Sequence, residues 1–219
     1  MIWIRQKLIP TEFAQWKAGN KGINFNYSSL PGEIKKILKQ SLLEEQHYLC
    51  AYTMLRINGE KSHIEHIEPQ SISNHKDLEY TNLLACYPGV DMGMIEYGAK
   101  LKDNSAERII SPHDRIVDES FYYSSNGTIV GKNELAERTI FVLNLNHREL
   151  KKSREETYSR FAKILIKNKI PLSAANKMLN SMLEREKLPE QFGVIRQILR
   201  KYIQKLEARA NRVKGVQRN

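Results

Sequence analysis

The spacing of apolar residues predicts a mixed first half and a helical second half. Pro31 can occupy the first turn of a helix. After it, apolar residues recur at helical spacing up to residue 50, so a helix is expected there. A short helix is expected over residues 10–17, ended by Gly19, with a polar loop over residues 21–29. From residue 133 onward we expect four more helices: one capped by Asn133, one over residues 150–165, one capped by Ser173 and one after Pro189.

Two Asn-Gly pairs predict β-hairpins, because this dipeptide supplies the positive φ angles that a two-residue hairpin turn needs. The first hairpin would join residues 52–57 to residues 62–67 through Asn58-Gly59. The second would lie within residues 121–131, around Asn126-Gly127. Hairpins followed by a run of helices predict an α+β fold.

Composition favours a cytoplasmic protein with an anionic partner and no membrane contact. The 219 residues contain no uninterrupted apolar run of the roughly 18 to 20 residues that a membrane span needs, and the first ten residues do not resemble a signal peptide. The two cysteines, Cys50 and Cys86, are therefore expected to be reduced rather than joined. A net charge of +10 and a pI of about 9.5 favour a partner such as nucleic acid.

The densest group of reactive side chains lies in residues 62–70, where two histidines and two glutamates fall within six residues. Phosphodiester hydrolysis needs a cation that neutralises the phosphate and a base that takes a proton from water. A carboxylate such as Glu65 suits magnesium or manganese, and the imidazole of His66, with an ordinary pKa near ~6.5, suits proton acceptance at neutral pH. This segment therefore contains residue types for both roles.

Strand geometry limits how these side chains can meet. Alternation would place His63 and Glu65 on one face and His66 on the other, so Glu65 and His66 converge only if the chain leaves strand geometry after Glu65, a departure that Pro69 favours. A solvated edge strand, whose histidines and glutamates simply face water, explains this segment equally well. Segments elsewhere in the chain favour the catalytic interpretation.

Four segments occur in one characteristic order: Cys50-Ala-Tyr-Thr53, His63-Ile-Glu-His-Ile-Glu-Pro-Gln70, Tyr80-Thr-Asn-Leu-Leu-Ala-Cys-Tyr-Pro88 and Tyr97-Gly-Ala-Lys-Leu-Lys-Asp103. This order resembles the HNH endonucleases, and among them the nuclease subunit of Septu-type and retron-associated antiphage systems. The resemblance implies a ββα-metal core over residues 41–150, flanked by the second hairpin. Residues 1–40 would form an N-terminal segment with the start of the entry helix, and residues 151–219 a helical region with a basic tail.

The resemblance also assigns roles to single residues. His66 matches the general base, Glu65 the acidic ligand of a magnesium or manganese ion, and Asn82 the asparagine that holds the loop and orients the histidine. Lys102 matches a basic residue that contacts the scissile phosphate. The implied function is metal-dependent cleavage of DNA or RNA by an effector of antiphage defence.

The chain departs from the family's pattern at a metal ligand. Ala99 stands where the family commonly has histidine or asparagine, and an alanine coordinates nothing. His63, on the strand face of Glu65, is the best substitute, and Asp103 and Asn104 are weaker candidates.

A second departure concerns structural zinc, which many relatives hold with four ligands. Thr53 and Tyr97 stand at two of those positions here. We therefore expect no structural zinc, and we expect Cys50 and Cys86 to be buried and apolar-like.

The C-terminal residues 194–219 contain one acid, Glu207, against eight bases: Arg196, Arg200, Lys201, Lys205, Arg209, Arg212, Lys214 and Arg218. Phosphate contact is one interpretation, and the solvated face of an amphipathic helix is the other. We favour a combination, in which the apolar stripe of residues 195–206 docks and the chain from Arg209 onward is frayed.

Two alternatives to a free-standing nuclease stay open. Ala99 and the missing cysteines suggest a catalytically degenerate HNH-fold subunit that binds nucleic acid or acts as a scaffold. Alternatively, cutting occurs only in complex with an ATPase of the SMC/ABC type, the partner that the resemblance implies. Apolar helical stripes beyond Leu150 could make that contact or simply form core.

Overall fold

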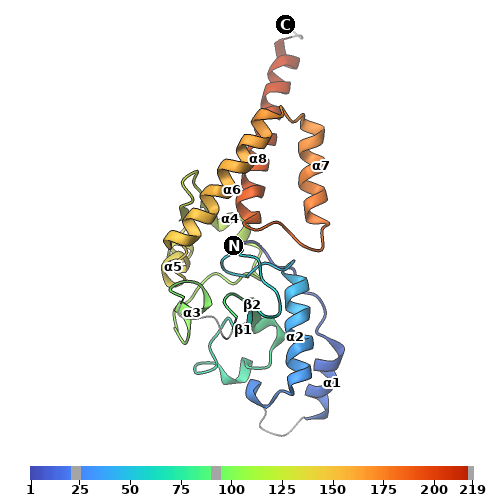
Figure 1. The fold of residues 1–219 in the computed structure, drawn as a ribbon, viewed down its shortest axis with the longest axis vertical. Coiled ribbons are helices and arrows are strands. Elements are labelled where there is room, and N and C mark those ends of the chain that lie inside the picture. The colour runs from blue at the N-terminus through green and yellow to red at the C-terminus, as the bar shows by residue number, and fades with distance from the viewer. Residues whose placement is uncertain (21–25, 90–94, 217–219) are drawn as a thin grey trace.

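The computed structural model describes residues 1–20, 26–89 and 95–216 and has an α+β fold, as the sequence predicts. Its elements are, in chain order, α1 (Thr11–Gly19), η1 (Tyr27–Ser29), α2 (Gly32–Glu45), β1 (His63–His66), η2 (Asn74–Lys76), η3 (Tyr80–Asn82), β2 (Leu83–Cys86), α3 (Ala99–Lys102), α4 (Val117–Ser120), β3 (Phe121–Tyr123), β4 (Ile129–Gly131), α5 (Glu134–Val142), α6 (Arg148–Lys167), α7 (Leu172–Leu183) and α8 (Phe192–Val216). Figure 1 shows α6, α7 and α8 extending as an arm from the part that contains β1, β2 and α3.

The strand that carries the histidine motif pairs differently from the prediction. β1 runs antiparallel to β2, with His63 opposite Cys86 and His66 opposite Leu83. The predicted hairpin through Asn58-Gly59 is wrong, because neither residue has the positive φ that its turn requires. The Asn58 side chain instead accepts hydrogen bonds from two following backbone N–H groups, which turns the chain without pairing two strands.

β2 takes the place of the expected partner because it is a fully buried apolar run whose backbone must be satisfied on both edges. β1 satisfies one edge. On the other, the side chain of Gln46 donates to the carbonyl of Ala85 at 2.7 Å and accepts from its N–H at 2.7 Å. Residues 48–57 meanwhile fold back on themselves, with the Ile57 N–H donating to the Tyr48 carbonyl.

The second predicted hairpin is confirmed. β3 and β4 pair antiparallel on either side of Asn126-Gly127, and Gly127 has a φ of 76°. The Ser124 N–H donates to the Thr128 carbonyl at 2.8 Å, which closes the turn. Here the local turn chemistry and the tertiary packing agree.

Several helix boundaries differ from the prediction. α2 ends at Glu45 rather than near residue 50, because His47 and Tyr48 adopt positive φ angles. α5 is capped by Asn133 as expected, but α7 begins at Leu172 behind Pro171, so Ser173 lies inside its first turn. The expected fraying from Arg209 is wrong, since α8 continues to Val216.

The polar loop expected over residues 21–29 is described only from residue 26, and Tyr27–Ser29 form a short 3-10 helix there. Residues 21–25, and Gly93 among the glycines after β2, lie outside the described residues.

Two arginine contacts, one buried and one partly buried, fix the arm to the rest of the chain. Arg154 of α6 is 2% exposed and donates to the carbonyls of Gly127 and Leu145, both at 2.6 Å. Arg196 of α8 makes a bidentate pair with Asp118. Because such pairs have fixed geometry, they set the direction in which the arm leaves the fold.

Among the described residues, no helix is both long enough and apolar enough to cross a lipid bilayer.

A substitution of Gly127 tests how tightly the second hairpin packs on α6. A methyl group at this position would meet the backbone carbonyl of Lys151, and φ there is positive. Gly127→Ala is therefore expected to lower the free energy of unfolding by more than about 2 kcal/mol, because left-handed backbone alone costs ~1–2 kcal/mol. Urea denaturation measures this.

Gly59→Ala is the matched control. No atom lies within 4 Å of the added methyl group, and φ is not positive. We expect a change below about 0.5 kcal/mol. Equal stability of the two variants would show that α6 does not constrain the turn.

Candidate active site

Glu65 lies in a buried cluster with a lysine and a histidine. Lys102 Nζ donates to Glu65 Oε1 at 2.9 Å and to the His66 carbonyl at 2.9 Å. His63 Nε2 lies 3.6 Å from Glu65 Oε2. The Lys102 side chain is 1% exposed, and a buried ammonium group is tolerated only when acceptors surround it. The Glu65 carboxylate is therefore already paired with a cation of the protein itself, the Lys102 ammonium group.

The position of Lys102 follows from the short helix α3. Gly98 precedes this helix with a φ of 68°, which allows the chain to turn sharply into it. Ala99 is 2% exposed, so the small side chain at this position lets α3 pack closely against the core. Lys102, one turn later, then reaches β1.

His63 is oriented by a backbone carbonyl. Its Nδ1 lies 2.6 Å from the Pro88 oxygen, which can only accept, so Nδ1 carries the proton and Nε2 faces Glu65. Burial disfavours the charged imidazole, but the Glu65 carboxylate and the Pro88 carbonyl outweigh it and raise the pKa of His63.

His66 contacts a different set of groups. Its Nε2 lies 3.0 Å from the Asp77 backbone oxygen and 3.1 Å from Asp77 Oδ1. Because the Asp77 carboxylate itself accepts from the Tyr27 N–H and the Gln70 amide, both contacts of Nε2 are to acceptors. Nε2 therefore carries the proton in the neutral ring, and Nδ1 keeps its lone pair.

Asp77 is the functional candidate that sequence reasoning missed. Residues 74–81 have the composition of a polar loop, and nothing in their spacing marks one carboxylate. In the structure Asp77 is 4% exposed and holds the imidazole of His66, whose ring edge also meets Tyr27 at a centroid distance of 5.2 Å. In a catalytic histidine, one ring nitrogen typically donates to an acceptor that orients the ring, while the other nitrogen acts as the base.

Asn82 braces the loop that carries Asp77. Its Oδ1 accepts from the Glu68 N–H at 2.8 Å, and its Nδ2 donates to the carbonyls of Glu68 and Lys76 at 3.1 and 3.2 Å. These bonds close the loop between the end of β1 and the residue before Asp77. Asn82 thus acts on His66 through the loop rather than through a direct hydrogen bond.

The sequence-predicted residues are therefore gathered in two groups. His63, Glu65 and Lys102 form one, and His66 forms the other with Asp77. The departure from strand geometry expected after Glu65 is wrong, because β1 keeps its pairing with β2 through His66, and the Glu65 and His66 side chains engage separate partners. The Lys102 bond to the His66 carbonyl links the two groups. The weaker metal candidates Asp103 and Asn104 are exposed beyond α3.

His63 and Glu65 fit two ligand positions of a divalent ion. Ligand atoms usually lie ~2.1 Å from such an ion, so two atoms 3.6 Å apart need little movement to share one. A metal-binding histidine commonly donates its other N–H to a carbonyl, as His63 does, and a nitrogen ligand favours manganese over magnesium. In the described ranges no group of three or more His, Cys, Asp and Glu side chains is placed to hold an ion. Lys102 competes, because it already neutralises Glu65.

Cys50 and Cys86 are both buried, as expected. Burial opposes the thiolate, but hydrogen bonds from the Cys86 thiol and from Thr53 and the Tyr87 N–H lower the pKa of Cys50 to about 6. Thr53 lies beside Cys50 and offers a hydroxyl group. Two thiols and a hydroxyl do not fit the four nitrogen or sulfur ligands of structural zinc.

No protein-family model matches this chain, and no curated protein matches it significantly in sequence.

The Lys102–Glu65 pair can be tested by removing its cation. Lys102→Met leaves a buried carboxylate with only His63 beside it, which is expected to lower the free energy of unfolding by about 3 kcal/mol. Urea denaturation measures the loss.

Lys100→Met is the control, because Lys100 is exposed on the same short helix. A surface substitution of this kind changes stability by less than about 0.5 kcal/mol. If Lys102→Met were no more destabilising than Lys100→Met, the ion pair would not hold α3 on β1.

Proposed function

We propose that this protein is a metal-dependent endonuclease of the HNH type that hydrolyses phosphodiester bonds of DNA or RNA. The observation that supports this proposal most is the state of His66. Asp77 engages its Nε2, which leaves Nδ1 as a proton acceptor one residue away from Glu65. Metal-assisted hydrolysis needs an imidazole base and a cation-binding carboxylate. His66 and Glu65 supply these two groups from neighbouring positions of β1, although their side chains engage separate partners.

In this proposal His66 Nδ1 takes the proton from the attacking water. The Asp77 carboxylate, 3.1 Å from Nε2, stabilises the imidazolium that forms and keeps the ring in the required tautomer. A positioned general base of this kind contributes about 10²- to 10⁴-fold to a rate. Asn82 positions the loop from which Asp77 acts.

His63 and Glu65 would hold the divalent ion, manganese or magnesium. Such an ion neutralises charge on the phosphate and polarises it. Metal binding at His63 must compete with a proton, since the pKa of this imidazole is raised, so metal affinity should increase with pH. Lys102 keeps Glu65 in place, and because its side chain is 1% exposed it would act on the phosphate through Glu65 rather than by direct contact.

The biological setting in the proposal comes from the sequence resemblance alone. It is an effector role in prokaryotic antiphage defence, in the cytoplasm, with an SMC/ABC-type ATPase as partner.

One observation favours a second function. The buried Lys102 ammonium group occupies Oε1 of Glu65 and leaves only Oε2 for another cation. A chain in which lysine has replaced the metal would be a catalytically degenerate HNH-fold subunit that binds nucleic acid or scaffolds a complex. This alternative predicts binding without metal-dependent turnover.

Cleavage of plasmid DNA and of RNA in manganese or magnesium tests the two functions. His66→Ala is expected to lower the cleavage rate by about 10²- to 10⁴-fold with its fold intact, because the general base is lost. His75→Ala is the matched control, since His75 is exposed in the same loop, and it should cut at the wild-type rate.

Cleavage by His66→Ala at the wild-type rate would end the assignment of His66 as base. Absence of cleavage by the wild-type protein with either metal, together with retained nucleic-acid binding, would favour the degenerate subunit.

A further inference from the structure

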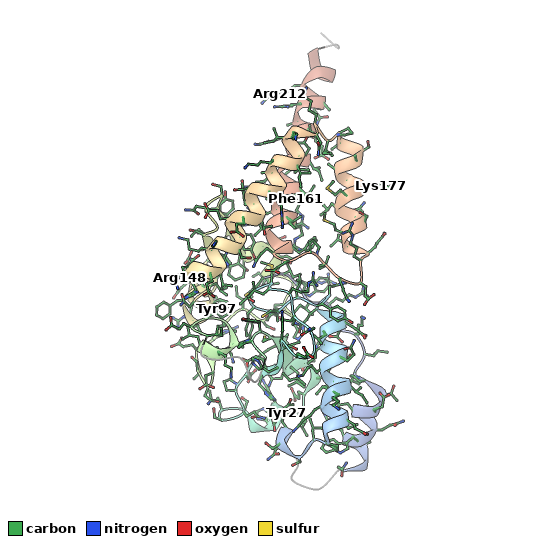
Figure 2. The ribbon with its side chains drawn as sticks, in the orientation of Figure 1. Tyr27, Tyr97, Arg148, Phe161, Lys177 and Arg212 are labelled. Atoms are coloured by element: carbon green, nitrogen blue, oxygen red, sulfur yellow. The ribbon has the colours of Figure 1, made fainter. Side chains whose placement is uncertain are left out.

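The outer part of the arm carries almost only positive charge. Residues 157–183 contain five bases and no acid. Residues 191–216 contain seven bases and the single acid Glu207. Figure 2 shows Arg212 near the free end of α8 and Lys177 on α7, so the charge covers more than one helix of the arm.

Nine of these bases are exposed and form no ion pair within the described residues, whereas Arg196 pairs with Asp118. Among the described residues, none of the following exposed bases belongs to an ion pair: Arg160, Lys163, Lys167, Lys169, Lys177, Arg200, Lys205, Arg209 and Arg212. In the rest of the described chain one exposed base, Arg138, pairs with an acid, Glu107. The arm therefore presents charge that the protein itself leaves unneutralised.

Four of the bases form a stripe along α8. Lys201, Lys205 and Arg209 are spaced four residues apart and Arg212 follows three residues later, so they lie along one side of the helix over ~16 Å. Glu207 lies two residues from both Lys205 and Arg209 and so does not face the stripe. The single acid therefore does not neutralise it.

A groove runs beside this stripe. A cavity of about 690 Å³ lies between the end of α6 and α8, and its lining includes Lys169 from after α6 together with Lys201, Lys205 and Arg209. No acid lines it. The rest of its lining is apolar or aromatic and includes Tyr202 and Leu165. Cations from two parts of the chain thus face one hollow.

We propose that this stripe, Lys201 to Arg212, and the adjoining groove bind the phosphate backbone of nucleic acid. This inference rests on the proposed function and deepens it, because it names a surface outside the site of His66 that would bind part of the same substrate. A duplex carries one negative charge per ~1.7 Å of its axis, so ~16 Å of helix faces several phosphates.

An acidic amphipathic helix of a partner protein is the other occupant that the groove could accept. The distribution of charge favours nucleic acid over it. A helix would need cations only at the rim of the groove, whereas unpaired bases also lie outside it, at Arg160, Lys163 and Lys177. Positive charge over the whole arm suits a polyanion that contacts it at many points.

Binding of labelled nucleic acid to the full chain in EDTA tests the proposal without requiring cleavage. The stripe variant Lys205→Gln, Arg209→Gln, Arg212→Gln leaves out Lys201, whose ammonium group lies 4.2 Å from the Tyr122 ring centroid. Fluorescence anisotropy with a duplex and a single strand of about 30 nucleotides, each over a range of salt, gives affinity and salt dependence.

We expect the stripe variant to bind at least about tenfold more weakly, with the slope of log K against log salt shallower by about 2 to 3. The matched control Lys7→Gln, Lys36→Gln, Lys61→Gln removes the same charge from exposed positions outside the arm and should bind like the wild type. Thermal melting checks that both variants fold.

Equal affinity and equal slope for the two variants would overturn the proposal. Failure of the wild type to bind either probe would also overturn it. So would stripe-dependent binding of a labelled acidic peptide by a protein that binds neither nucleic-acid probe. Because no divalent metal is present, these outcomes are separate from the nuclease assignment. Stripe-dependent binding by a protein that never cleaves would leave this inference standing and remove the proposed activity.

Discussion

The Lys102 ammonium group is the contact on which the candidate site depends. It donates to the Glu65 carboxylate and to the His66 carbonyl, and so joins α3 to β1 at the point where the reactive residues lie. A buried cation is costly without acceptors, so helix and strand must be placed together. The same contact limits the site, because any metal ion at Glu65 must share its carboxylate with Lys102.

The second constraint is the loop between β1 and β2. Asn82 closes this loop through three hydrogen bonds, and Asp77 within it holds Nε2 of His66. The imidazole therefore has a defined tautomer before any substrate binds. This preorganisation is what a general base requires, since a freely rotating ring would spend part of its time with the wrong nitrogen exposed.

Sequence reasoning succeeded where structure is decided locally. Asn126-Gly127 formed the predicted hairpin and Asn133 capped its helix, because turn and cap chemistry act within a few residues. The same dipeptide failed at Asn58-Gly59, because burial of β2 recruited β1 and overrode the local preference. Glu65, His66 and Lys102 were chosen by type and order, but the burial of Lys102 depends on packing between segments distant in sequence.

Asp77 shows the same limit at the site itself. Asp77 contacts His66 through its backbone carbonyl as well as its carboxylate. The position of a backbone carbonyl cannot be predicted from the type of residue that carries it. The basic arm lies between these cases. Its positive charge can be predicted from the sequence. That Lys169, Lys201 and Lys205 line one groove follows only from the fold.

The protonation of the neutral His66 ring tests the central claim most directly. Nitrogen-detected NMR of protein with ¹⁵N-labelled histidine distinguishes the two tautomers. We expect the proton on Nε2 and an unprotonated Nδ1. A proton on Nδ1 in the wild-type protein would contradict the assignment of this imidazole as an oriented general base.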